Sequence, residues 1–223
     1  MRERVEGRID QGTSVSLTGV VYWWDDSRQA FSDAAECFVR TVALVGDRWE
    51  RPGLGQWDVR SLVGHTSRAL LTVESYLARP AAAVDVPSAA DYFRATSAVA
   101  ADSAVAARGR DAGTALGSDP ATAVAEIAAR VLPIVDDRAD TELVTTIAGG
   151  MRLGDYLPTR TFELVIHTLD LAAALGVQPD VPRIAAAQAL HLVADLAVAG
   201  GHLGPLLLAA TGRATLPAGF SVL

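Results

Sequence analysis

Apolar and polar residues follow one another along this chain with the period of an α-helix rather than with the two-residue period of a strand. The first clear apolar stripe predicts a helix over about residues 27–45, and its members are Phe31, Ala34, Ala35, Phe38, Val42 and Val45. Asp58 is a typical N-cap for a second helix over about residues 59–77. His65 falls on the apolar stripe of this second helix, so we expect it to face the core.

Two further helices are marked by their start signals. Ser88 with Asp91 forms a capping box and predicts a third helix that ends near Arg108. Three glycines are then expected to interrupt the helical pattern, namely Gly109, Gly113 and Gly117. A fourth helix is expected over about residues 119–135, because this segment begins with an Asp-Pro pair that is favoured at helix starts.

The longest apolar helical segment spans residues 160–175 and contains no Gly or Pro. It is apolar on nearly every side, which predicts a position in the middle of a helical bundle. Asp155 is expected to cap this helix and Gly176 to end it. Just before it, residues 142–153 contain β-branched residues around a Gly-Gly pair, which predicts a short hairpin or an irregular excursion.

The pattern divides the chain into three parts and predicts an all-α fold. Residues 25–176 form a helical bundle, and residues 177–223 form a short helical C-terminal addition packed on it. Residues 1–24 do not have the pattern of a signal peptide, because acidic residues interrupt the basic ones and no small-residue cleavage site follows the apolar piece. We expect an N-terminal extension that is partly disordered, or an early start codon.

Composition and charge narrow the class of protein. Half of the 223 residues are apolar and few are aromatic, which favours helices. A net charge of −7 without any basic run argues against nucleic acid as a partner. No apolar run reaches the roughly 18 residues that a membrane span needs. Cys37, the only cysteine, cannot form an internal disulfide and is expected to be a small buried residue, so a reducing, cytoplasmic location is predicted.

Three residues on two predicted helices have the pattern of metal ligands. Glu163 and His167 are four residues apart and so share one face of the central helix, and His65 faces the core from the second helix. Two histidines and one carboxylate leave coordination positions open for water or substrate, which is typical of reactive metal sites. The other two histidines, His191 and His202, are expected to be structural or exposed.

Each of these residues also has an ordinary structural interpretation. Glu-x-x-x-His pairs occur by chance, and Glu163 can form an ion pair with Arg160. Asp170 lies one turn after His167 and can orient a ligand imidazole, or it can be a solvated or capping residue. Arg60 and Arg160 flank the ligand positions and can hold an anionic substrate as catalytic residues, with surface ion pairing as the alternative.

Two sequence signatures carry a resemblance to a known family. Residues 57–65, WDVRSLVGH, preceded by RPGL, resemble the helix-two signature of the DinB-like bundle and, more narrowly, of the mycothiol-dependent maleylpyruvate isomerase family. The partner signature of that family is Glu-x-x-x-His followed by Asp-Leu and a Gly stop, and it is similar to residues 163–176. The resemblance covers about residues 25–176.

The resemblance implies a four-helix, up-down-down-up bundle that holds a divalent metal at His65, Glu163 and His167. The metal is usually zinc in this family, with Ni²⁺, Fe²⁺ or Mn²⁺ as alternatives, and the implied thiol cosubstrate is mycothiol. The family isomerase has a further α/β domain that contributes an arginine to activity. Residues 177–223 are instead mostly helical in pattern, so isomerisation of maleylpyruvate itself is not implied.

The function expected from the residues and the resemblance together is that of a metal-dependent, thiol-dependent transferase or isomerase. Its partners would be a small-molecule thiol and a small electrophilic substrate, with no nucleic acid and no membrane, and a homodimer is left open. Two alternatives remain at this point. The bundle can be a non-catalytic metal-binding or stress-response module, or its metal can activate water in a hydrolase.

Overall fold

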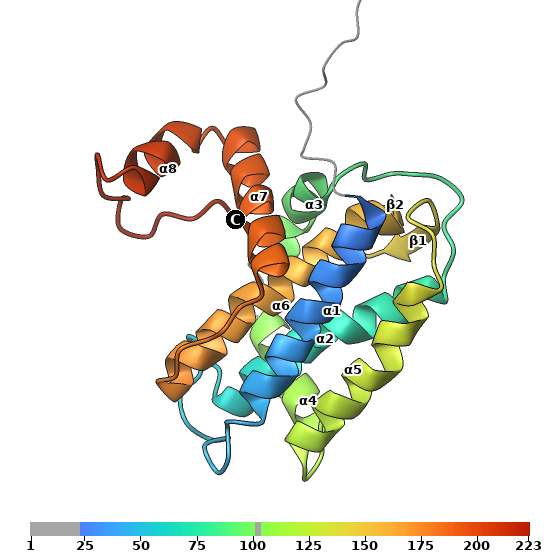
Figure 1. Ribbon diagram of the computed structural model, residues 1–223, viewed down its shortest axis with the longest axis vertical. Coiled ribbons are helices and arrows are strands. Elements are labelled where there is room, and N and C mark those ends of the chain that lie inside the picture. Colours follow the sequence, from blue (N-terminus) through green and yellow to red (C-terminus); the bar gives the residue numbers. More distant parts are fainter. Residues whose placement is uncertain (1–22, 101–103) are drawn as a thin grey trace, which may run out of the picture.

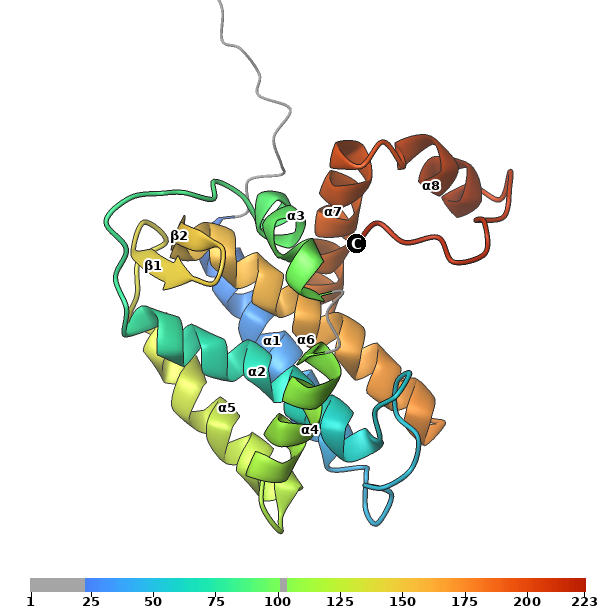
Figure 2. The ribbon, with the colours of Figure 1, turned by 180° about the vertical axis from the view of Figure 1, so that it is seen from behind.

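The computed structural model describes residues 23–100 and 104–223, and four of its helices form a bundle (Figure 1). They are α1 (Trp24–Val42), α2 (Val59–Leu77), α5 (Pro120–Asp136) and α6 (Leu153–Leu175). Helices α1 and α6 run in one direction, whereas α2 and α5 run in the opposite direction, as a second view confirms (Figure 2). The fold is therefore all-α and DinB-like, with the up-down-down-up order that the family resemblance implied.

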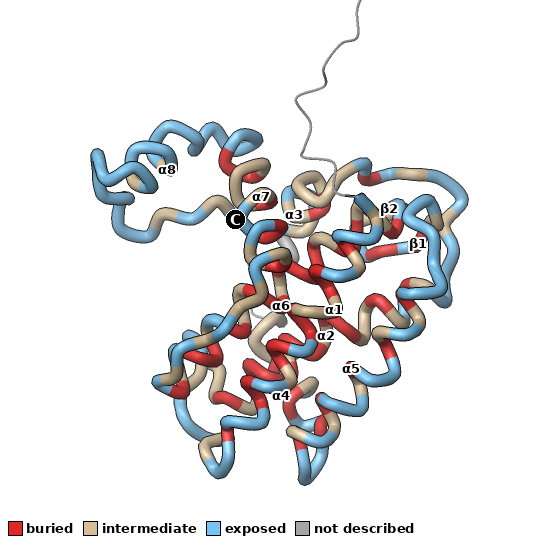
Figure 3. Tube along the Cα trace, in the orientation of Figure 1, coloured by how far each residue is buried: buried red, intermediate tan, exposed pale blue. Residues whose placement is uncertain are grey.

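Helix α6 is the centre of the molecule, as its sequence predicted. It packs against α1 and α2 in the bundle and against α3 (Ala89–Ala100) and α7 (Arg183–Ala199) outside it. Its fully buried residues include Leu157, Leu164 and Leu171, one every second turn. The trace of α6 carries buried stretches where it crosses the bundle (Figure 3). Burying a leucine side chain contributes roughly 1.5–3 kcal/mol, so this row fixes α6 against its neighbours.

Smaller elements surround the bundle. Helix α4 (Ala104–Ala115) packs along α2, and the strands β1 (Leu143–Thr146) and β2 (Gly149–Arg152) form an antiparallel hairpin before α6. Helix α8 (Leu203–Ala210) projects from the bundle beyond α7, and none of its residues is buried (Figure 1). In the described part of the chain, no helix combines the length and hydrophobicity that a membrane crossing requires.

Several local predictions are confirmed. The side chain of Asp58 accepts a hydrogen bond from the backbone N–H of Ser61, and Asp119 caps α5 in the same way through Thr122. Gly176 ends α6 with a φ of 68°, a left-handed conformation that residues with a side chain rarely adopt. The hairpin, which was one of two alternatives for residues 142–153, is present as β1 and β2.

The prediction that Gly109 and Gly113 interrupt a helix was wrong, because both lie inside α4. The third predicted helix is instead divided into α3 and α4, and residues 101–103 between them lie outside the described part of the chain. A Cβ atom added to Gly113 would lie 2.7 Å from the backbone oxygen of Arg60. Close packing against α2 therefore requires glycine there, and this tertiary requirement outweighs its low helix propensity.

Two predicted helix starts also need correction. Helix α1 begins at Trp24 and ends at Val42, about three residues earlier at each end than predicted. Helix α6 begins at Leu153, so Asp155 lies in its first turn and does not cap it. The backbone carbonyls of the preceding loop take the place of a cap, because Leu153 N donates to Glu142 O at 2.7 Å and Gly154 N donates to Asp140 O at 2.9 Å.

The predicted N-terminal extension, residues 1–24, lies outside the described residues except for Trp23 and Trp24. Of the predicted C-terminal addition, α7 packs against α1 and α6, whereas α8 contacts α7. Cys37 is buried in α1, as expected of a small apolar residue, and its thiol donates to the backbone oxygen of Asp180 at 3.3 Å.

Candidate metal centre

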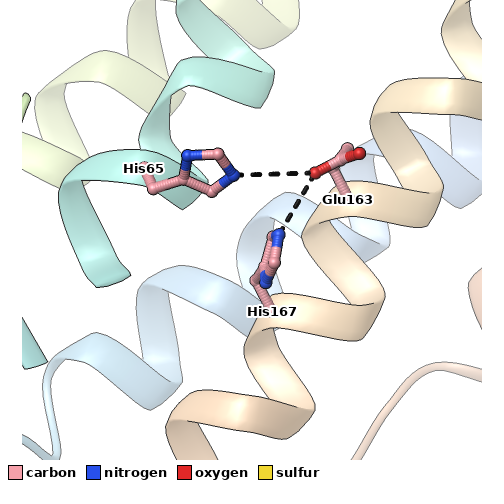
Figure 4. Close-up of side chains that lie close together, drawn as sticks. All are labelled: His65, Glu163 and His167. Atoms are coloured by element: carbon pink, nitrogen blue, oxygen red, sulfur yellow. Dashed lines mark ion pairs between the residues drawn. The ribbon is translucent and has the colours of Figure 1, made fainter. Parts of the chain in front are cut away.

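The three predicted ligands come together between α2 and α6. His65 projects from the second turn of α2, and Glu163 and His167 project one turn apart from the middle of α6 (Figure 4). Their ligand atoms all lie within 4.8 Å of one another. The two imidazoles point toward the same carboxylate oxygen of Glu163 (Figure 4). The antiparallel packing of the two helices is what brings the three residues together.

The distances within this group are short enough for the three residues to share one cation. Glu163 Oε2 lies 3.2 Å from His167 Nε2 and 3.9 Å from His65 Nε2. Bond lengths of 2.0–2.1 Å in a tetrahedral site place neighbouring ligand atoms about 3.3 Å apart. The donor atoms are therefore close to the separations that a zinc-sized ion needs, with two nitrogens and one oxygen as its ligands.

Asp170 lies behind His167, on the same helix. Its Oδ2 atom is 2.9 Å from Nδ1 of His167, so Nδ1–H donates to the carboxylate and Nε2 faces Glu163. A carboxylate at this position fixes the tautomer and the orientation of a ligand imidazole. The structure thus places Asp170 where the orienting role requires it.

Without a metal ion, the three candidate ligands differ in the direction of their pKa shifts. Although burial disfavours its charged form, hydrogen bonds to Asp170 and Glu163 raise the pKa of His167 to about 9. Burial would raise the pKa of Glu163, but its hydrogen bond with His167 and the positive charge of Arg160 lower it to about 2. Burial, together with the charge on His167, lowers the pKa of His65 to about 4. At neutral pH His167 is therefore the protonated, positively charged imidazole, whereas His65 is neutral and Glu163 is ionised.

A cavity of about 580 Å³ opens beside the three ligands. Its wall is partly aromatic, with the side chains of Trp57, Tyr76, Tyr92 and Phe93. Three arginines from three different helices also line it, namely Arg68, Arg108 and Arg160. A cavity of this volume is in the range of small-molecule sites, and its cations favour an anionic ligand.

The two arginines that were predicted to flank the ligand positions differ in their surroundings. Arg160 is buried at the cavity wall, where its guanidinium lies 5.2 Å from the ring centre of Tyr92 and 5.0 Å from that of Tyr156. Arg60 is not among the residues that line the cavity. It donates a hydrogen bond to Gly117 O at 3.0 Å and lies 3.7 Å from the Glu50 carboxylate.

Sequence reasoning missed two of the three cavity arginines. Arg68 is three residues after His65, so it shares a face of α2 with a predicted ligand, and this spacing was a usable signal. Arg108 carries no such signal, because it reaches the cavity only through the packing of α4 on α2. Trp57 ties the loop before α2 to α4, because its Nε1 donates to Ala106 O at 3.1 Å.

The fold and this site define a class of protein: a DinB-like helical bundle in which two neighbouring helices present two histidines and a glutamate to one cavity. The family model described as the mycothiol maleylpyruvate isomerase N-terminal domain matches residues 31–172. This is well over half of the chain, so the chain belongs to that family. The matched segment includes the three ligand residues, Asp170 and all of α2 and α5. Searches of curated proteins and of solved structures found no match.

Proposed function

We propose that this protein is a metal-dependent enzyme that uses a low-molecular-weight thiol, mycothiol, to modify a small electrophile as a transferase or an isomerase. One observation supports the proposal above all others. His65, Glu163 and His167 gather their ligand atoms within 4.8 Å at the wall of a cavity that also carries three arginines. Membership of the mycothiol isomerase family supports the choice of thiol.

The residues fit a divalent cation, with Zn²⁺ first and Ni²⁺, Fe²⁺ or Mn²⁺ as alternatives. Two neutral imidazoles and a carboxylate are a donor set for such ions, and they leave positions open. A cation bound there would lower the pKa of a thiol that it contacts, and would so supply thiolate at neutral pH. Asp170 accepts the hydrogen bond of Nδ1–H and so directs Nε2 of His167 toward the site, where Nε2 would become a ligand atom once its own proton has left.

The cavity would hold the electrophile beside the thiol. Arg160, which Tyr92 and Tyr156 hold from two sides, would bind a carboxylate of the substrate from the wall next to Glu163. In a transfer by substitution, the carbon–sulfur bond forms as the bond to a leaving group such as chloride breaks, and the thiol proton passes to solvent. In a transfer by addition, the carbon–sulfur bond forms as the π bond of a double bond breaks, and the proton passes to the other carbon. In an isomerisation, the carbon–sulfur bond forms at a double bond, the remaining carbon–carbon single bond rotates, and the thiol is expelled unchanged.

The test compares zinc-loaded and zinc-free protein in two assays with mycothiol. One assay uses 1-chloro-2,4-dinitrobenzene and follows thiol consumption, which reports transfer. The other uses maleylpyruvate and follows isomerisation by chromatography. We expect activity in at least one assay, and we expect it to require zinc. The Glu163→Gln variant should lose about 100-fold or more, because it removes a ligand charge at the site.

Glu74→Gln is the matched control. Glu74 lies on α2 outside the cavity, where it pairs with Arg130 at 2.8 Å. This variant should keep the wild-type rate. Equal rates with and without zinc, or equal rates for wild type and Glu163→Gln, would contradict the proposal. Stoichiometric metal without product from any electrophile would support the non-catalytic binding module instead.

A further inference from the structure

The two histidine ligands are oriented in different ways. His167 has the carboxylate of Asp170 behind its ring, at 2.9 Å from Nδ1. The Nδ1 atom of His65 is buried and has no hydrogen-bond partner among the described residues. Ligand imidazoles are usually held by a hydrogen bond at the nitrogen that does not face the metal. Some other contact must therefore fix the ring of His65.

The indole of Trp57 makes that contact. Its ring centre lies 4.5 Å from that of His65, and the two planes are inclined by 33°. The ring of His167 also meets that of His65 edge-on, with ring centres 4.9 Å apart and planes at 85°. The imidazole of His65 thus has two aromatic ring contacts among the described residues, and Trp57 is the partner that is not itself a proposed ligand.

Trp57 is held in turn by the backbone of α4. Its Nε1 donates to the backbone oxygen of Ala106 at 3.1 Å. One turn further along α4, the indole lies against Gly109, where a Cβ atom would come within 2.6 Å of the ring atoms Cε2 and Nε1. Only a residue without a side chain leaves room for the ring at this distance.

Helix α4 is itself fixed to the helix that carries His65. A Cβ atom added to Gly64 would lie 2.1 Å from the backbone nitrogen of Gly113. The two helix backbones are therefore in direct contact at the residue before the ligand. This contact fixes the distance between α4 and α2, and therefore fixes the positions of Ala106 and Gly109, which contact the indole.

We propose that Trp57 is the positioning residue for His65, and that the glycine contacts between α2 and α4 hold Trp57 in place for this role. The aromatic face of Trp57 fixes the orientation of the His65 ring by packing, whereas the Asp170 carboxylate orients His167 by a hydrogen bond. The inference rests on the proposed metal centre, because its consequence is the orientation of one of the three ligands.

Cobalt binding tests this role with a readout other than activity. Co²⁺ is titrated into metal-free protein and followed by its visible absorption, which reports both affinity and ligand geometry. Trp57→Leu should bind Co²⁺ about 10–100-fold more weakly and with an altered spectrum, as expected when the support of a ligand imidazole is lost. Trp57→Phe keeps an aromatic face and should stay close to wild type. Gly109→Ala should behave like Trp57→Leu, because its methyl group displaces the indole.

Trp49→Leu is the matched control. Trp49 lies in the same loop before α2, stacks 5.6 Å from the Arg60 guanidinium and does not line the cavity. It should change thermal stability without changing Co²⁺ affinity. In metal-free protein, proton NMR should show the His65 ring signals shifted by the indole ring current in wild type and Trp49→Leu, but not in Trp57→Leu.

The outcomes separate this inference from the proposed function. Wild-type Co²⁺ affinity and unchanged His65 signals in Trp57→Leu would overturn the positioning role and leave the metal centre standing. A wild-type protein that binds no Co²⁺ would overturn the proposed function and this inference with it. Equal losses in Trp57→Leu and Trp49→Leu would show a general effect of loop packing and would also overturn the positioning role.

Discussion

Metal binding should release about one proton per ion at pH 7, and that proton should come from His167. Two carboxylates, Glu163 and Asp170, hold a proton on this imidazole in the metal-free protein and raise its pKa to about 9. Metal can bind Nε2 only after the proton has left. Replacing Asp170 with Asn keeps a hydrogen-bond acceptor but removes the negative charge, so the pKa of His167 should fall.

The magnitude follows from the pKa values. At pH 7 a group with a pKa of about 9 is about 99% protonated, whereas an ordinary histidine with a pKa of about 6.5 is about one quarter protonated. Removing the proton at pH 7, two units below the pKa, costs about 2.7 kcal/mol. Apparent affinity should therefore rise about tenfold for each pH unit up to about pH 9 and then level off. His65 and Glu163 should release nothing, because their pKa values are about 4 and about 2.

Titration calorimetry in buffers of different ionisation enthalpy measures the proton count directly. Wild type and Asp170→Asn are compared with Mn²⁺ at pH 7, so that any proton from water on the ion contributes equally to both. We expect about one proton for wild type and clearly less for Asp170→Asn. A wild-type affinity that does not change between pH 6 and 8, or equal proton counts for the two proteins, would show that metal does not displace a proton held by Asp170 on His167.

Three further predictions concern stability and the ligand set. In the presence of chelator, the free energy of unfolding should fall as the pH rises from about 6.5 through 9, because the folded state holds the His167 proton more tightly than the unfolded chain does. Urea unfolding at a series of pH values measures this decrease, and the His167→Gln variant should not show it. Gly64→Ala should destabilise the protein by about 1–3 kcal/mol, because the added methyl group would meet the backbone of α4. A Tm equal to that of wild type would contradict the close contact between the backbones of α2 and α4. Leu164→Ala should cost about 2–5 kcal/mol in urea unfolding, since Leu164 is fully buried in α6, and a loss below 1 kcal/mol would contradict that burial.

Local sequence patterns were enough to predict the helices that carry the site. The spacing of Glu163 and His167 places them on one face of any helix, and the apolar stripe around His65 directs it inward. Asp58 caps α2 through its own side chain, so the start of that helix is a local property. What these patterns predict depends on neighbours three or four residues away, which a single sequence contains.

The parts that were missed depend on residues far apart in the chain. Gly109 lies inside a helix because Trp57, about fifty positions earlier, packs where a side chain would be. Arg160 has an environment that its own segment does not reveal, because Tyr92 comes from α3. Arg60 was assigned to the site by proximity along the chain to His65, but the helical turn directs it toward Glu50 and Gly117. Only the packing of helices decides such contacts.

Anomalous diffraction at the zinc edge, from crystals of the zinc-loaded protein, will show whether His65, Glu163 and His167 hold one divalent cation at the wall of the cavity. We expect one strong peak about 2.0–2.2 Å from Nε2 of each histidine and from a carboxylate oxygen of Glu163, and no peak there in the His65→Ala, His167→Ala double variant. A wild-type crystal with no peak among these residues, or with its only peak elsewhere, would show that the three residues are not a metal centre.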